Sequence, residues 1–131
     1  MGWTDYGIAV DVHFQTTAPA TVMGRIDGTD VLPAGNARWP AGYILRLKPD
    51  GAWELRSAVF KKPMVTLAAG SATIDKTQWH HLELRFHGGQ IQATLDGVVL
   101  ASVEDETHAH GMFAIGTEWD RIEFDNLRVT P

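Results

Sequence analysis

The sequence contains no cysteine, no cluster of positive charge and no long apolar run. Without cysteine, the chain has no disulfide, no thiolate metal site and no cysteine nucleophile. The formal net charge is −5, and Lys61 and Lys62 are the only adjacent basic pair, so nucleic acid is not expected as a partner. No apolar run approaches the roughly 20 residues of a membrane helix, and no span is expected.

What the sequence does contain is apolar and polar residues in strict alternation. Between Tyr6 and Gln15, Ile8 and Val10 fall on one face, while Asp11 and His13 fall on the other. A period of two is typical of a β-strand with one buried side. Helical periodicity is almost absent, and only a weak helical turn is expected at Asp75–Gln78. The 131 residues are therefore expected to form one all-β domain covering 1–131.

Turn signals divide the alternating segments into about ten short strands. Pro49-Asp50-Gly51 and Asp96-Gly97 are the clearest hairpin turns, because proline presets φ and glycine accepts positive φ. This spacing predicts a two-layer antiparallel β-sandwich or jelly roll. After the first strand, the expected strands are Ala20–Ile26, Gly42–Lys48, Ala52–Ser57, Val65–Ala69, Trp79–Phe86, Gln90–Leu95, Val98–Val103, Gly111–Thr117 and Ile122–Val129.

The last expected strand carries an irregularity. Its apolar phase slips by one residue at Asp125-Asn126, between Phe124 and Leu127. A β-bulge produces this slip, since it inserts one extra residue into a strand. The pair can then turn a carboxylate and a carbonyl toward a cation or a neighbouring loop.

Aromatic and polar residues suggest a carbohydrate site, because sugar C–H faces stack on aromatic rings and sugar hydroxyls bind polar side chains. Trp39, in the irregular stretch 27–41, is the best candidate for an exposed platform, and Trp119 is next. Trp3, Trp53 and Trp79 are expected to pack in the core or at a sheet edge instead. If one sheet is concave, its polar lining would consist of His13, Gln15, Arg46, Glu83, Arg85 and Gln92.

Metal binding and catalysis find less support in the residues. The stretch from Glu104 to His110 contains a His-x-His pattern with carboxylates, which is more typical of a solvated loop than of a metal site. His80 and His81 alternate across a strand, so one is expected to be buried and hydrogen-bonded and the other exposed. Glu123-Phe124-Asp125 begins the carboxylate pattern of jelly-roll glucanases, but the second glutamate is missing.

The order of several short motifs carries a family resemblance. These are Trp3-Thr4-Asp5-Tyr6, Val10-Asp11-Val12, Gly24-Arg25, Trp79-His80-His81-Leu82-Glu83-Leu84, Leu95-Asp96-Gly97, Gly111-Met112, Ile115-Gly116-Thr117 and Phe124-Asp125-Asn126-Leu127. In this order they resemble the concanavalin A-like, or laminin G-like, jelly-roll superfamily. The sequence is most similar to the C-terminal lectin domain of galactocerebrosidases, which are family 59 glycoside hydrolases.

The resemblance implies a structural calcium ion and a parent enzyme. In the relatives the aspartate of the last motif, here Asp125, binds calcium, and a carbonyl of the third strand, here that of Gly42 or Tyr43, adds a ligand. Other ligands precede the first tryptophan, where this chain has only Met1 and Gly2. The resemblance further implies an accessory module beside the catalytic domain of a secreted, extracellular or periplasmic enzyme.

The function expected from these observations is recognition of a glycan, galactose-containing or related, by a non-catalytic lectin-like module. Two alternatives stay open. In the first, the domain is a purely structural or interaction sandwich without a sugar site. In the second, which is less favoured, it is a small jelly-roll hydrolase. The tentative sugar-binding residues are Trp39, Arg46, Trp119 and His13, and the tentative calcium ligands are Asp125 and Tyr43.

Overall fold

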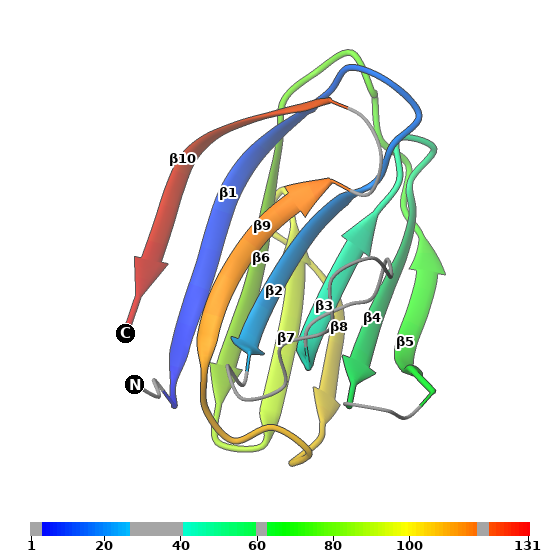
Figure 1. Ribbon diagram of the computed structural model, residues 1–131. Helices are drawn as coiled ribbons and strands as arrows, with labels where there is room; N and C mark the ends of the chain where they lie inside the picture. The colour runs from blue at the N-terminus through cyan, green and yellow to red at the C-terminus, as the bar shows by residue number, and fades with distance from the viewer. Residues whose placement is uncertain (1–3, 27–40, 60–62, 118–120) are drawn as a thin grey trace, which may run out of the picture.

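The computed structural model describes residues 4–26, 41–59, 63–117 and 121–131. These residues form two five-stranded antiparallel sheets packed face to face as a β-sandwich (Figure 1). The predicted all-β sandwich is confirmed. The strands are β1 Tyr6–Phe14, β2 Ala20–Ile26, β3 Gly42–Leu47, β4 Ala52–Ala58, β5 Val65–Ser71, β6 His80–His87, β7 Gln90–Leu95, β8 Val98–Glu104, β9 Met112–Thr117 and β10 Ile122–Thr130.

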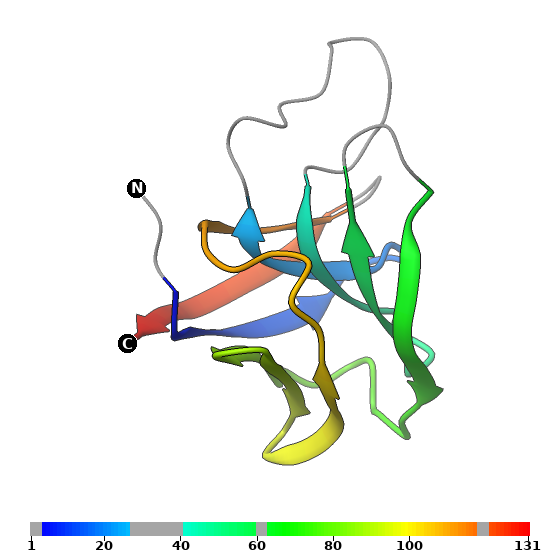
Figure 2. The same cartoon turned by 90° about the horizontal axis from the view of Figure 1, so that it is seen from below.

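Each sheet combines a run of consecutive strands with strands from the ends of the chain. One sheet has the order β10-β1-β6-β7-β8, and the other has the order β5-β4-β3-β2-β9. Figure 2 shows the sandwich from below, with β10 and β1 at one side and β5 at the opposite side. The first and last strands pair, and Gly7 lies opposite Thr130. The described residues include no helix long and apolar enough to cross a membrane.

The core lies between the sheets and is built from the alternation seen in the sequence. In β1, the side chains of Ile8, Val10 and Val12 are completely buried. They pack against the inward faces of β6 and β7 in the same sheet and of β2, β3 and β4 in the other. Burying a side chain of this size stabilises the fold by about 1.5–3 kcal/mol. Trp53 belongs to this core, as predicted for packing.

Two bulges bend strands near the polar sites. In β10, Asn126 and Leu127 oppose the single residue Val10 of β1, and Asn126 adopts a φ of 53°. This confirms the slip predicted at Asp125-Asn126. In β2, the pairing with β9 shifts between Met23 and Ile26, where Arg25 adopts a φ of 49°. The β2 bulge was not predicted.

The structure also corrects local expectations. At Asp75–Gln78 the expected weak turn is present as a single turn, closed by the Gln78 N–H on the Asp75 carbonyl at 3.0 Å, and it does not continue into a helix. Trp79 precedes β6 and is 47% exposed, so of the core or edge packing expected for it only packing at the edge is possible. His80 is buried and hydrogen-bonded and His81 is exposed, as predicted.

Candidate functional site

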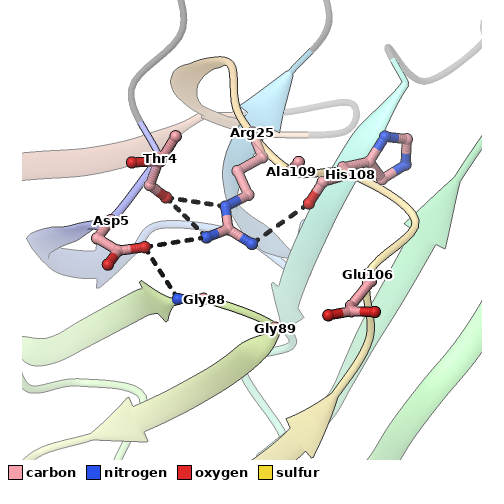
Figure 3. Close-up of a pocket in the computed structure, with 8 residues that line it drawn as sticks. All are labelled: Thr4, Asp5, Arg25, Gly88, Gly89, Glu106, His108 and Ala109. Atoms are coloured by element: carbon pink, nitrogen blue, oxygen red, sulfur yellow. Dashed lines mark hydrogen bonds and ion pairs between the residues drawn. The ribbon is translucent and has the colours of Figure 1, made fainter.

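A polar pocket opens at one end of the sandwich. It has a volume of about 380 Å³ and lies where the start of β1, the end of β2, the β6–β7 turn and the segment after β8 meet (Figure 3). This volume lies within the range of small-molecule sites. Its lining consists of Thr4, Asp5, Arg25, Gly88, Gly89, Glu106, His108 and Ala109.

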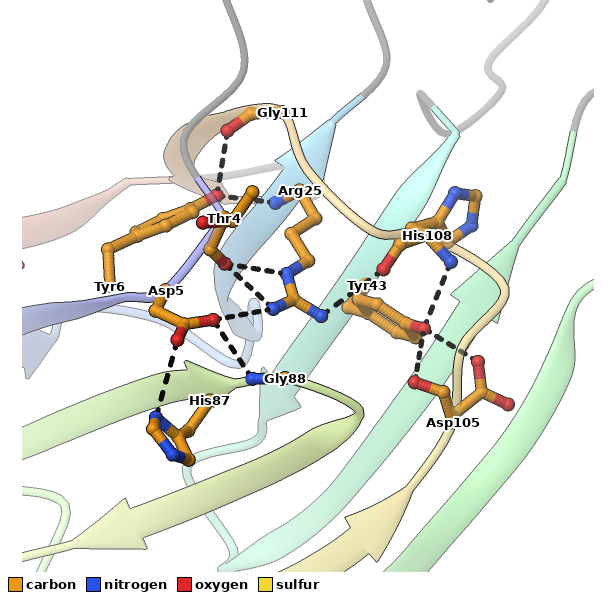
Figure 4. Close-up of polar contacts among 10 residues, drawn as sticks. All are labelled: Thr4, Asp5, Tyr6, Arg25, Tyr43, His87, Gly88, Asp105, His108 and Gly111. Carbon is orange, nitrogen blue, oxygen red and sulfur yellow. Dashed lines mark hydrogen bonds and ion pairs between the residues drawn. The ribbon is translucent and has the colours of Figure 1, made fainter.

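Arg25 lies beneath this pocket and is only 1% exposed. Its Nε and Nη2 donate to the Thr4 carbonyl at 3.0 and 2.7 Å, and Nη1 donates to the His108 carbonyl at 3.3 Å (Figure 4). The Asp5 carboxylate lies 3.5 Å from Nη2, and the guanidinium lies 4.8 Å from the centre of the Phe86 ring. A buried guanidinium is tolerated when its donors are satisfied in this way. Arg25 therefore joins the first described residues to the segment after β8.

Two tyrosine hydroxyls fix the same segment from inside the sandwich. The Tyr6 hydroxyl accepts from the Arg25 N–H at 2.6 Å and donates to the Gly111 carbonyl at 3.0 Å. The Tyr43 hydroxyl donates to Asp105 Oδ1 at 2.6 Å and accepts from the His108 N–H at 3.1 Å. Both hydroxyls connect elements that are far apart in the sequence (Figure 4). The pocket wall is thus held in place before any ligand arrives.

The Tyr43–Asp105 hydrogen bond acts on the pKa values of both groups. Burial, reinforced by the carboxylate of Asp105, raises the pKa of Tyr43 to about 12. Burial alone would raise the pKa of Asp105, but hydrogen bonds from Tyr43 and Thr107 lower it. A carboxylate that accepts such donors stays ionised at neutral pH. The pair is therefore suited to holding the loop, and no proton transfer is indicated.

The pocket mouth carries carboxylates and glycine backbone. Asp5 Oδ1 accepts the Gly88 N–H at 2.9 Å, and Asp5 Oδ2 lies 3.4 Å from His87 Nδ1. In Figure 3 the Glu106 side chain lies on the side of the pocket away from Asp5, next to Gly89. Since Arg25 is already engaged by protein oxygens, the open part of the pocket offers mainly acceptors. Such a lining suits hydroxyl donors better than an anion.

A second polar surface lies on the outer face of the sheet β5-β4-β3-β2-β9, and we call it the Arg46–Glu54–Arg56 ladder. Arg46 Nη1 lies 3.5 Å from Glu54 Oε1. Arg56 binds Glu54 Oε2 through Nη2 at 2.6 Å and Nε at 2.8 Å. The three side chains are 14, 28 and 27% exposed in residue order. The ladder is partly enclosed, and its guanidinium and carboxylate groups hold each other in fixed orientations.

The predicted sugar-binding residues do not share one surface. Arg46 belongs to the ladder, whereas His13 lies on β1, in the other sheet. The proposed polar lining of a single sheet was therefore wrong, because Gln15, Glu83, Arg85 and Gln92 also belong with the sheet of β1, β6 and β7. Trp39 and Trp119 lie outside the described residues.

The two tentative calcium ligands also lie apart. Asp125 is exposed on β10 opposite Asp11, and its Oδ1 accepts the Asn126 N–H at 2.8 Å. Tyr43 lies in a middle strand of the other sheet and faces the core. The two residues therefore belong to different sheets, and no described group of three or more His, Asp or Glu side chains is arranged to hold a metal ion. Calcium binding stays a prediction.

The loop from Glu104 to His110 has a structural role in its middle. The His108 ring is 9% exposed and packs edge-on against Tyr43, with ring centroids 5.1 Å apart. His110 is exposed, so the two histidines of the His-x-His pattern differ in environment. The expected solvated loop therefore holds for His110 but not for His108.

Comparison with known proteins places the chain in a family. The model of the galactocerebrosidase C-terminal lectin domain matches residues 1–131. The chain belongs to this family. No curated protein sequence matches the chain significantly. The resemblance stated from the sequence motifs is thus confirmed.

Solved structures support the same fold for the lectin domain. A carbohydrate-binding module, CBM66 from Bacillus subtilis, aligns with a TM-score of 0.79 at 18% identity, covering 100% of this chain and 78% of that one. Sheep galectin-11, solved with glycerol, aligns with a TM-score of 0.69 at 8% identity and covers 98 and 94% of the two chains. Caenorhabditis elegans galectin LEC-6 gives 0.67 at 14% identity, with coverages of 98 and 84%. At these identities the likeness concerns the fold.

Sequence reasoning missed two members of the ladder. Glu54 and Arg56 alternate on the strand that follows Pro49-Asp50-Gly51, and that turn sets the register that places Arg46 opposite Glu54. The turn and the alternation together could have predicted that Arg46, Glu54 and Arg56 lie side by side on one face. Nothing comparable marked Arg25, whose burial depends on a bulge and on residues 21 and 83 positions away.

Proposed function

We propose that the lectin domain binds a glycan on the outer face of the sheet β5-β4-β3-β2-β9, at the Arg46–Glu54–Arg56 ladder. The observation that carries the proposal is the geometry of Glu54, whose two carboxylate oxygens are each approached by a different arginine. The role is non-catalytic recognition. The family supports a module that accompanies the catalytic domain of a glycoside hydrolase.

The ladder offers the hydrogen-bonding groups that a sugar ring requires. Neighbouring sugar hydroxyls act as donors and acceptors at once, so they bind a surface on which guanidinium donors flank a carboxylate acceptor. Because the ion pairs already fix these side chains, little conformational entropy is lost on binding. The partial enclosure of Arg46 limits competition by water. A neutral glycan is favoured, and the family name supports one that contains galactose.

The polar pocket is a weaker candidate for the glycan site than the ladder. Arg25 is the most buried polar group of the pocket. Its N–H groups already contact Thr4, Asp5 and His108. This arrangement favours a structural part for the Arg25 cluster. If the whole domain served only structure or docking, the ladder would be a solvated ion-pair network with little effect on any ligand.

The proposal is tested with a glycan array followed by calorimetry on the best ligand. Arg46→Ala and Glu54→Gln should each weaken binding by roughly tenfold or more, because each removes a hydrogen bond to a charged group. Arg85→Ala is the matched control, since Arg85 lies in the other sheet and donates to Thr130 Oγ1 at 2.7 Å. Trp39→Ala tests the predicted platform. Absence of binding to every glycan, or equal affinity for all variants, would contradict the proposal.

A further inference from the structure

Trp79 is exposed in a way that core packing does not explain. It precedes β6 and keeps 47% of its surface accessible, whereas Trp53 in β4 is 8% exposed. A single exposed apolar residue is ordinary on a protein surface. What distinguishes Trp79 is that its indole ring is stacked on the ring of His13, with centroids 5.2 Å apart and an interplanar angle of 23°.

The histidine behind Trp79 cannot rotate freely. His13 Nδ1 lies 2.8 Å from Glu123 Oε1, and His13 Nε2 lies 3.2 Å from the Thr77 carbonyl. These contacts join β1, β10 and the turn that precedes Trp79. One face of the indole is therefore backed by a fixed ring. A ligand that stacks on this aromatic group need not order it first, and the entropic cost of binding falls accordingly.

Polar groups adjoin the stacked pair on the same side of the sheet. The side-chain amide Nε2 of Gln15 donates to Glu123 Oε1 at 2.8 Å. The side-chain oxygen Oε1 of Gln15 and Glu123 Oε2 have no hydrogen-bond partner among the described residues. The Glu123 side chain is 56% exposed. An exposed aromatic face bordered by fixed oxygen acceptors matches a sugar ring, whose C–H face is apolar and whose rim consists of hydroxyl donors.

We propose that Trp79, His13, Gln15 and Glu123 form a second glycan contact, separate from the ladder, that binds a neutral pyranose by stacking. The contact lies on the sheet β10-β1-β6-β7-β8, and the ladder lies on the opposite sheet. A neutral sugar is specified because the carboxylate of Glu123 repels an acidic one. This contact and the ladder share only the class of ligand. Two contacts on one domain would raise the avidity for a long glycan.

The test uses nuclear magnetic resonance of the 15N-labelled protein titrated with lactose, galactotetraose and cellotetraose. Concentrations up to about 20 mM cover the millimolar affinities expected of a shallow site. The indole N–H signal of Trp79 is assigned by its loss in Trp79→Phe. We expect one of these sugars to shift this signal equally in the wild type and in Arg46→Ala. Trp79→Ala should lower the affinity at this contact roughly tenfold, and Trp79→Phe should lower it less.

The outcomes separate the two sites. Shifts at the ladder amides with a stationary Trp79 signal would overturn this second contact and leave the proposed function intact. Shifts at Trp79 without shifts at the ladder amides would support the second contact and contradict the proposed function. A Trp79 signal that stays fixed with all three sugars overturns the inference. Gln15→Ala, which removes an exposed amide, should weaken binding several-fold at an unchanged melting temperature, and this guards against a variant that simply unfolds.

Discussion

The side-chain amide of Asn126 donates a hydrogen bond to Asp11 Oδ2 at 2.7 Å, across the bulge between β10 and β1. The other oxygen, Asp11 Oδ1, lies 2.7 Å from His81 Nδ1. Asp125 faces Asp11 in the register, and two carboxylates placed directly opposite destabilise a sheet. The hydrogen bonds from Asn126 and His81 lower the pKa of Asp11 and compensate for this repulsion.

Replacing Asn126 tests this arrangement. Asn126→Ala should destabilise the protein by about 1–2 kcal/mol, because it removes the hydrogen bond and places alanine at positive φ. Asn126→Gly relieves the backbone and should recover part of the loss. Urea unfolding measures both variants, and titration of Asp11 should show its pKa rising in each. Equal stability of all three proteins would mean that the bulge does not depend on this contact.

The calcium prediction is tested through the melting temperature. A ligand that binds only the folded state raises the midpoint as its concentration increases. We expect calcium to raise the melting temperature of metal-free wild-type protein and to leave Asp125→Asn unchanged. Magnesium serves as the control cation, since it prefers a stricter geometry. If wild type melts identically with calcium and with chelator, Asp125 acts only in the β10 bulge.

Gly24 is expected to tolerate no side chain. A Cβ at this position would collide with the Phe86 ring and meet Ile8 Cδ1 at 3.0 Å, inside the core. Gly24→Ala should therefore cost about 1–3 kcal/mol. Gly116→Ala is the matched control in β9, because its Cβ would meet only Thr21 Oγ1 at 3.6 Å. Thermal unfolding compares the two variants, and similar losses would show that the fit around Phe86 is looser than it looks.

His80 should make stability depend on pH. Burial lowers its pKa, but hydrogen bonds to Asp96 Oδ2 at 2.7 Å and the Asp75 carbonyl at 2.6 Å outweigh it, and the net pKa is raised above 6.5. The stabilisation is complete below the unfolded value and is lost as the pH rises through the folded value.

Urea unfolding of the wild type should show a free energy of unfolding that declines as the pH rises from about 6 to about 9. His80→Gln should lack this part of the decline while remaining less stable at low pH. His87→Gln is a control, because the His87 side chain is 85% exposed. The assignment to His80 fails if His80→Gln shows the same slope as the wild type.

The sequence specified local features far better than spatial ones. Alternation predicted the strands, and the phase slip predicted the bulge at Asp125-Asn126, since both are properties of adjacent residues. The strand order decides to which sheet a polar face belongs. β1 pairs with β6 and β10, which are distant in sequence. For this reason the sequence could not predict that His13 and Arg46 lie on different sheets. The burial of Arg25 could not be predicted from the Gly24-Arg25 motif, because its partners are brought together only by the tertiary fold.

The pairing of Gly7 with Thr130 brings the two ends of the described chain to one margin of the sandwich. A short peptide linker across that margin would join β10 to β1 with little loss of entropy. The chain could then be opened at another exposed turn without changing the order of the sheets. Circular permutation is therefore a practical route for moving the point at which this domain is attached to other proteins.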